Sequence, residues 1–335
     1  MKLLLIGLDG VRVDLALPDL VAADPAFAAP DHPADPRFSA PGGTGAPVGD
    51  PPATPVAPTL ARLAAGGRLV PVWMTPPTDS GPGWASLLTG TTHEQNDVWW
   101  NEFVGHRLAR CPDLLSQVFA ADPRARTFAA CTWSALVDPS GPGPVVHQRP
   151  DQQVGGQHQL FAATDLSDGC RSADRQVTTR AAWVLNHEGP DAAFVHLEGV
   201  DEAGHRSGAA SDDYLAAVSA VDEHVRHLVK AVAERFEQLG EDWLVAVTTD
   251  HGHKAEGGHG EDEVVVRRSF LLLHRLGGPL PASLTALTTL RSEQVAPALL
   301  AAVGVRPGSL VTDHEVGVLR DVAPVGPTRD LRHEW

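Results

Sequence analysis

The sequence is poor in cysteine, methionine, tyrosine and basic residues. Its three cysteines, Cys111, Cys131 and Cys170, show no CxxC spacing. An odd and sparse set of this kind argues against a disulfide framework, and we expect structural thiols. The chain has 26 Lys and Arg residues against 42 Asp and Glu residues, and its formal net charge is −16 at pH 7. A chain this acidic is not typical of a nucleic-acid-binding protein, so we expect no stable nucleic-acid partner.

Long hydrophobic runs are also missing. No apolar stretch reaches the roughly 18 to 20 residues that a membrane helix needs. The apolar run in MKLLLIGLDG is too short for a signal peptide, and Asp9 ends it. We therefore expect no membrane partner and a cytoplasmic location. With 335 residues, 43% hydrophobic and 20% charged, the composition is that of a globular protein.

Strand patterns alternate with helical patterns along most of the chain. Apolar strand-like runs occupy residues 3–8, 126–133, 191–200 and 242–250. Helical patterns occupy 57–70 (a short helix followed by a strand), 80–90 (a Gly/Pro turn leading into a short helix), 211–240 and 295–305. This alternation predicts a three-layer α/β/α sandwich with a mostly parallel central sheet. We expect one catalytic domain over 1–320 with a Pro/Ala-rich insertion at 24–58, and a C-terminal tail at 321–335.

Acidic and histidine residues follow three of the predicted strands. Asp9 ends the first strand, and the pair Asp250–His251 ends another. GVDEAGH (199–205) carries Asp201 and His205 across an expected loop, and His259 lies in GGHG. In parallel sheets the chemistry lies beyond the carboxyl ends of the strands, which would bring these residues together.

Three Asp and three His residues in one place would hold two divalent cations. Carboxylate and imidazole are the ligands of catalytic zinc, although manganese or iron can use the same set. His253 is a rival to His259, which we prefer because its flanking glycines suit a constrained backbone. Taken singly, each Asp could be a turn residue and each His a surface residue. The joint pattern favours a metal site and a hydrolase of phosphoryl-like groups.

Five motifs in a fixed order carry a resemblance to a known family. They are LLLIGLDGVR, PPTDSGPGWASLLTG (76–90), WWNEF (99–103), GVDEAGH (199–205) and TTDHGHKAEGGHG (248–260). In this combination the chain resembles the alkaline phosphatase superfamily, and within it the nucleotide pyrophosphatase/phosphodiesterase-like branch, the type I phosphodiesterases. The resemblance implies an alkaline phosphatase-like fold.

The resemblance also implies a role for each site residue. One ion would be bound by Asp9, Asp250, His251 and the oxygen of Ser80, and the other by Asp201, His205 and His259. Ser80 matches the nucleophile of the family, and Thr78 and Asp79 match it less well. Asn101 matches an Asn that donates to a phosphoryl oxygen, and backbone N–H groups after Ser80 would assist it. The alternative for Ser80 is an ordinary helix N-cap.

The function implied is a two-metal hydrolase of small anionic phosphate esters. We expect a phosphodiesterase or nucleotide pyrophosphatase that forms a covalent phospho-serine, with zinc as the first choice of metal. The alternatives are a phosphomonoesterase, a phosphonate hydrolase, or a metal-binding homologue without catalysis. A sulfatase is not expected, because Trp84 stands where the sulfatase motif has Arg. Gly81 replaces the aromatic residue that usually follows the nucleophile, so nucleotide preference is not implied.

Overall fold

The computed structural model describes residues 1–30 and 56–305. Most of the predicted insertion and all of the predicted C-terminal tail lie outside these residues. The strands are β1 Lys2–Leu8, β2 Arg68–Trp73, β3 Thr127–Cys131, β4 His158–Ala162, β5 Ser167–Asp168, β6 Ala192–Leu197, β7 Trp243–Thr248, β8 Arg268–Leu276 and β9 Leu290–Arg291. Among these residues, no helix is both long enough and apolar enough to cross a membrane.

The helices fill the connections between strands. They are α1 Val13–Ala16, α2 Pro18–Ala23, α3 Pro58–Ala65, α4 Ser80–Thr89, α5 His93–Asn96, α6 Leu114–Ala121, α7 Pro150–Val154, α8 Gly169–His187, α9 Gly199–Ser207, α10 Asp212–Leu239, α11 Val264–Arg267, α12 Ala282–Thr285 and α13 Val295–Ala302. The predicted long helix is confirmed as α10, which Ser211 caps through the N–H of Tyr214 and which ends at Gly240 in the left-handed conformation. The long helix α8 was not predicted from the sequence.

Eight strands form one sheet in the order β4-β3-β6-β1-β7-β8-β2-β9. From β4 to β7 neighbouring strands are parallel, while β8 runs antiparallel to both β7 and β2. The sheet is therefore mostly parallel, as predicted. The three central strands β6, β1 and β7 end together, since Leu8 pairs with Leu197 and Gly7 pairs with Thr248.

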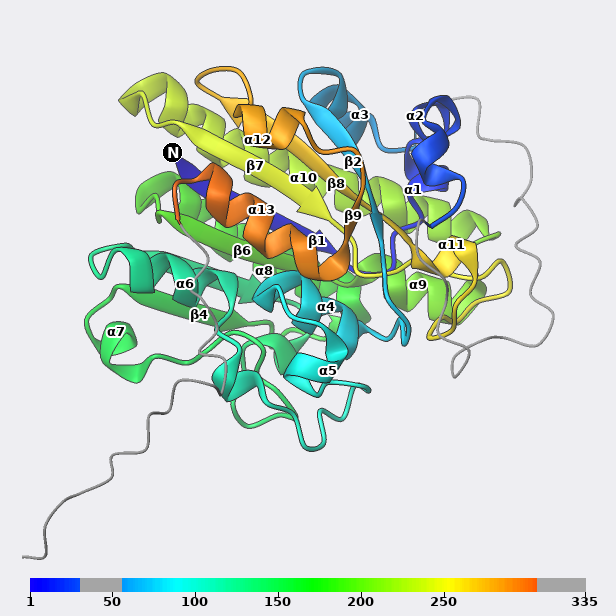
Figure 1. Cartoon of the computed structure of the whole chain (residues 1–335), viewed down its shortest axis with the longest axis horizontal. Helices are drawn as coiled ribbons and strands as arrows, with labels where there is room; N and C mark the ends of the chain where they lie inside the picture. Colours follow the sequence, from blue (N-terminus) through cyan, green and yellow to red (C-terminus); the bar gives the residue numbers. More distant parts are fainter. Residues whose placement is uncertain (31–55, 306–335) are drawn as a thin grey trace, which may run out of the picture.

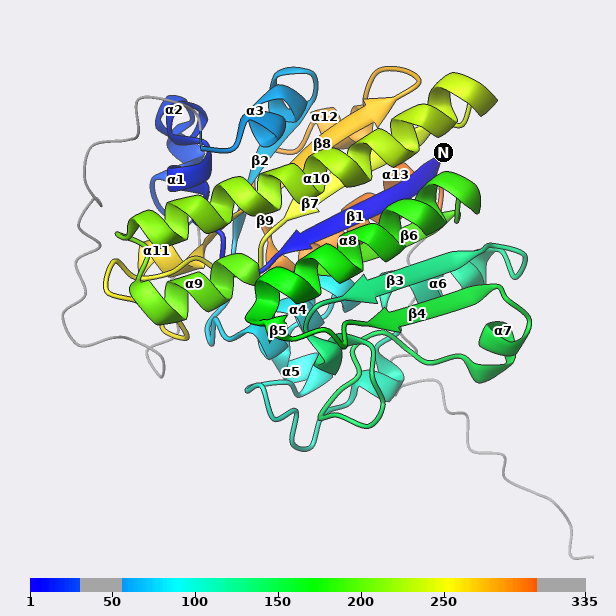
Figure 2. The ribbon, with the colours of Figure 1, turned by 180° about the vertical axis from the view of Figure 1, so that it is seen from behind.

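Both faces of the sheet are covered by helices. Along β1, Leu4, Ile6 and Leu8 belong to the apolar core that includes α8 and α10, whereas Leu3 and Leu5 belong to the core on the opposite face. Figure 2 shows α8 and α10 lying across one face, and Figure 1 shows α4, α6 and α13 on the other. Side chains of a strand point alternately to the two faces, so a strand buried on both must be apolar throughout. This confirms the three-layer α/β/α sandwich.

Candidate active site

The site lies at the carboxyl ends of the three central strands. Asp9 directly follows β1, and Asp250 follows the end of β7 by two residues. Asp201 lies in the first turn of α9, which begins just after β6. Asp9 and Asp250 are fully buried. The parallel arrangement brings these three carboxylates together, as the order of strands in the sequence predicts.

One group consists of Asp9, Asp250, His251 and Ser80. The Nε2 atom of His251 lies 3.3 Å from Oδ1 of Asp9 and 3.4 Å from Oδ2 of Asp250. Ser80 Oγ lies 3.4 Å from Asp9 Oδ1 and 3.2 Å from His251 Nε2. Ser80 is the first residue of α4, and the N-cap position belongs to Asp79. The alternative of Ser80 as the N-cap is therefore wrong, and its hydroxyl faces the metal-ligand candidates.

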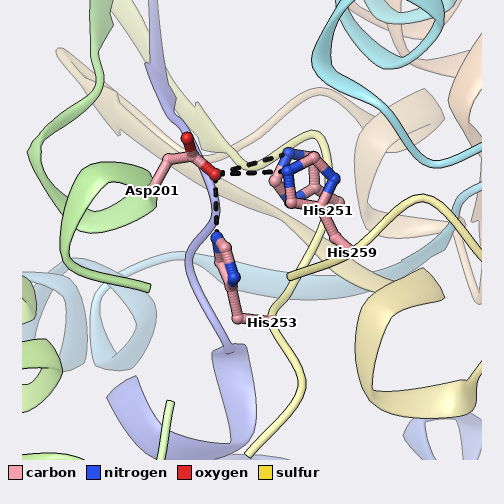
Figure 3. A group of neighbouring side chains, drawn as sticks. All are labelled: Asp201, His251, His253 and His259. Carbon is pink, nitrogen blue, oxygen red and sulfur yellow. Dashed lines mark hydrogen bonds and ion pairs between the residues drawn. The ribbon is translucent and has the colours of Figure 1, made fainter. Parts of the chain in front are cut away.

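A second group lies beside the first and comes from α9 and the loop after β7. Asp201 and His205 were expected across a loop, but both lie on α9. Residues four apart are neighbours on a helix, so the two side chains lie on one face. His205 Nε2 lies 3.5 Å from Asp201 Oδ2 and 3.0 Å from His259 Nε2. His259 Nε2 lies 3.5 Å from Asp201 Oδ1. His253 also joins the group, with Nε2 at 2.8 Å from Asp201 Oδ1 (Figure 3).

Potential ligand atoms converge in two overlapping sets, which differ from these groups because His251 belongs to both sets and His205 to neither. In the first set, Asp9, Asp250 and His251 each contribute one atom, and these atoms all lie within 4.8 Å of one another. The same holds in the second set, which consists of Asp201, His251, His253 and His259. Asp250 Oδ2 is buried without a hydrogen-bond partner among the described residues. A buried carboxylate oxygen without a partner is costly unless a cation or a water satisfies it.

Backbone carbonyls orient two of the imidazoles. His251 Nδ1 lies 3.0 Å from the carbonyl oxygen of Gly252, and His259 Nδ1 lies 2.9 Å from that of Thr78. Each Nδ1 therefore donates a proton to a carbonyl oxygen, which directs each Nε2 toward the site, as in most metal-bound histidines. The Thr78 hydroxyl donates to the carbonyl of Glu261 and so fastens the loop that carries His259. Thr78 is thus occupied in holding that loop.

Asp9 is held by two residues that the sequence analysis did not single out. Its Oδ2 accepts hydrogen bonds from His196 Nε2 and Trp84 Nε1, both at 2.9 Å, which leaves Oδ1 to face Ser80. A Cβ at Gly7 would lie 2.3 Å from the Trp84 ring, so only glycine lets the indole approach β1. His196 is the one polar residue of the apolar strand β6, which is a signal that the sequence did offer.

The electrostatics of the buried group favour an added positive charge. Burial raises the pKa of Asp250 well above its usual value, and the charge of Asp9 raises it further. Burial lowers the pKa of His251, but the carboxylates of Asp250 and Asp9 outweigh this effect and raise the pKa to about 10. Three carboxylates in a low-dielectric pocket therefore attract a cation strongly.

Asn101 lies against the turn that follows Ser80. Its Oδ1 accepts the N–H of Gly81 at 2.7 Å, which leaves the amide NH₂ as its remaining polar group. The expectation that backbone N–H groups after Ser80 assist Asn101 is not supported, because Gly81 N–H is used in this bond and Pro82 has none. Arg12 does not take part in this turn. It is buried and pairs with Asp14.

The chain matches a family profile and parts of two known proteins. A family profile described as Type I phosphodiesterase / nucleotide pyrophosphatase matches residues 52–274, which is more than half of the chain. The catalytic subunit of mouse GPI ethanolamine phosphate transferase 3 is 24% identical over 208 residues, and GPI ethanolamine phosphate transferase 1 of Candida glabrata is 41% identical over 71 residues. These matches cover 62% and 21% of this chain. They span only 17% and 8% of the two relatives.

Solved structures share the fold at low sequence identity. Murine ectonucleotide pyrophosphatase/phosphodiesterase 5 superposes with a TM-score of 0.57 at 13% identity, over 92% of this chain and 96% of that one. A 2-O GAG sulfatase gives a TM-score of 0.57 at 12% identity, over 92% of this chain and 72% of that one. The predicted alkaline phosphatase-like fold is confirmed by this likeness.

Proposed function

Because this chain belongs to the type I phosphodiesterase / nucleotide pyrophosphatase family, we propose that it is a two-metal phosphodiesterase acting through Ser80. Family membership supports a phosphoester hydrolase. The observation that carries the finer proposal is the position of Ser80 Oγ, at 3.2 to 3.4 Å from His251 Nε2 and Asp9 Oδ1. A hydroxyl at the edge of a metal-ligand cluster is the arrangement of an activated nucleophile.

The residues fit two tetrahedral ions. At metal–ligand distances of about 2.0 to 2.1 Å, two ligands of a tetrahedral zinc ion are separated by about 3.3 Å. Four of the six separations among Asp9, Ser80, Asp250 and His251 run from 3.2 to 3.4 Å. Those among Asp201, His205 and His259 run from 3.0 to 3.5 Å. The unpartnered oxygen of Asp250 supports the same conclusion.

We assign Asp9, Ser80, Asp250 and His251 to one ion, and Asp201, His205 and His259 to the other. The mixture of nitrogen and oxygen ligands suits zinc, with manganese or iron as alternatives. When bound, such ions act as Lewis acids, neutralise the phosphoryl charge and favour deprotonation of a hydroxyl or a water.

The proposed reaction has two steps. Ser80 Oγ attacks phosphorus, the bond to the leaving oxygen breaks, and the proton lost from Ser80 is balanced by the one that the leaving alcohol gains. Water then attacks the phospho-Ser80, the Oγ–P bond breaks, and a phosphate monoester leaves as Ser80 regains its proton. The Asn101 amide donates to a non-bridging oxygen in both steps, and Trp84 and His196 keep Asp9 in place.

The test compares hydrolysis of bis(p-nitrophenyl) phosphate with that of p-nitrophenyl phosphate after zinc or manganese is restored. We expect faster turnover of the diester, and a loss of roughly 10³-fold or more in kcat for Ser80→Ala. Ser140→Ala, at an exposed serine in a loop, is the matched control and should keep wild-type activity. Faster turnover of the monoester would indicate a phosphomonoesterase. Metal binding without turnover of either ester would contradict the enzyme and favour the non-catalytic homologue.

A second candidate is cleavage or transfer of a phosphoester that carries an ammonium group. Burial raises the pKa of Asp79, beside the nucleophile; the charge of His251 lowers this pKa, and the carboxylates of Glu261 and Glu102 raise it. Such an acidic rim would favour a cationic substituent. Two relatives are named as ethanolamine phosphate transferases. Hydrolysis of p-nitrophenyl phosphorylcholine should then exceed that of bis(p-nitrophenyl) phosphate, and Glu102→Gln should remove the difference.

A further inference from the structure

We infer that His253 is a positioning residue, which donates a hydrogen bond to Asp201 and holds that carboxylate in place for the second ion. The inference rests on the proposed two-ion function. It separates His253 from His259, although the two residues lie in one loop and both reach Asp201 (Figure 3).

The contacts of His253 define which of its nitrogens carries the proton. The side chain is fully buried, and its Nε2 lies 2.8 Å from Asp201 Oδ1. Its Nδ1 is buried and has no hydrogen-bond partner among the described residues. A carboxylate can only accept, so the neutral ring places its proton on Nε2 and donates it to Asp201. Nε2, the only nitrogen that faces the site, then has no lone pair to offer an ion.

The distances distinguish a hydrogen bond from a shared ion. At 2.8 Å, the separation between His253 and Asp201 is that of a charge-assisted hydrogen bond. His205 and His259 lie 3.5 Å from Asp201 Oδ2 and Oδ1, and their Nε2 atoms lie 3.0 Å apart; these values bracket the value of about 3.3 Å for two ligands of one tetrahedral ion. His205 and His259 therefore have the spacing of ligands, and His253 has that of a donor to a ligand.

The space for the His253 ring is provided by glycines. A Cβ at Gly204, on α9, would lie 2.5 to 2.6 Å from three atoms of the imidazole, and a Cβ at Gly10 would lie 3.0 Å from its Cδ2. The buried guanidinium of Arg12 donates to the backbone carbonyl of His253 at 3.4 Å. The ring is thus fixed between α9 and the loop after β1. A support held this firmly keeps a ligand within the small tolerance that a metal site needs.

The experiment measures zinc binding in the absence of substrate. Zinc per chain is determined by elemental analysis, and apparent affinity by competition with a chelator, for the wild type, His253→Gln, His253→Leu and His205→Ala. We expect two zinc ions per wild-type chain. His253→Leu should bind one of the two roughly 10- to 100-fold more weakly, yet reach two ions at saturating zinc. His253→Gln should keep wild-type affinity, because its amide nitrogen can still donate to Asp201. His205→Ala should lose one ion.

Two results would overturn the inference. One is a stoichiometry of one ion in His253→Gln with two ions in His205→Ala, which would make His253 a ligand. The other is wild-type affinity in His253→Leu. His253→Gln keeps the size and polarity of the ring, so the comparison stands even if the leucine variant fails to fold. A wild-type chain that binds fewer than two ions would instead overturn the proposed function itself.

Discussion

The absence of a side chain at Gly81 shapes the turn that follows Ser80. A Cβ at position 81 would lie 3.0 Å from both the Asn101 Oδ1 and the backbone oxygen of Trp100. Gly81 therefore lets the segment that carries Asn101 pack against the start of α4. An aromatic residue, which usually follows the nucleophile in the related branch, could not be accommodated here without moving that segment. The identity of residue 81 is thus coupled to the placement of Asn101.

Asn101 offers a sharp test of transition-state stabilisation. Asn101→Ala should lower kcat for the diester by about 10²- to 10³-fold, because a donor aimed at the developing charge is lost. Asn101→Asp keeps an acceptor for the N–H of Gly81 but cannot donate, and it adds negative charge. We expect it to be at least as slow as Asn101→Ala, with a thermal unfolding temperature close to that of the wild type. Near-normal activity in Asn101→Asp would rule out the donor role.

At the scale of elements, a buried carboxylate on α8 fixes the start of α9. Asp174 accepts the N–H groups of Glu198 and Gly199 at 3.0 and 2.9 Å and the hydroxyl of Thr132 at 2.7 Å. α9 has no side-chain cap of its own, so Asp174 satisfies N–H groups at its first turn from a neighbouring helix. Asp201 lies in that turn.

Replacing Asp174 should therefore affect the second ion more than the first. Asp174→Asn puts an amide N–H group against backbone N–H groups, and we expect a loss of about 1 to 2 kcal/mol in the free energy of unfolding. We also expect an affinity roughly 10-fold lower for one of the two zinc ions.

Asp113 provides a matched control for Asp174. It is buried and caps α6 by accepting the N–H groups of Leu115 and Ser116, in a part of the fold that contributes none of the proposed ligands. Asp113→Asn should lose similar stability and keep wild-type zinc binding. Equal effects of the two variants on zinc affinity would show that Asp174 has no specific role in placing α9.

For the whole molecule, the site joins distant parts of the chain. Carboxylates that follow β1, β6 and β7 meet at one edge of the sheet, and Ser80 reaches them from α4 on the opposite face from α8 and α10. Without a cation, the buried charges of Asp9 and Asp250 repel each other. Ions that bind only the folded chain would therefore stabilise the entire domain.

Metal removal should lower the thermal unfolding temperature. At zinc concentrations about 1,000-fold above Kd, one bound ion adds about 4 kcal/mol to the free energy of unfolding. Dialysis against a chelator should remove that increment, and added zinc should restore it. Asp250→Asn is the control. It relieves the repulsion with Asp9, so it should unfold at a higher temperature than the metal-free wild type but gain less stability from zinc, because only the ion site of Asp201, His205 and His259 stays intact. An unfolding temperature that does not change with the chelator would contradict the proposed ion sites.

The sequence alone determined the fold class and the residue types of the candidate ligands. Short, fully apolar runs that alternate with helical patterns indicate strands covered on both faces, and polar residues at their carboxyl ends are expected at one edge of a parallel sheet. The prediction therefore reached Asp9, Asp201 and Asp250 without the structure. β8 and β4 were missed, and so was α8.

The different roles of chemically similar residues depended on tertiary contacts. The sequence favours His259 over His253 only through its flanking glycines, whereas their distances to Asp201, 3.5 and 2.8 Å, support the proposed roles of ligand and donor. Asp174 precedes α9 by 25 residues in the chain, and Trp84 is brought to Asp9 by packing across Gly7. Such contacts join residues far apart in the chain, so no local pattern records them, whereas strand periodicity and ligand type are local properties.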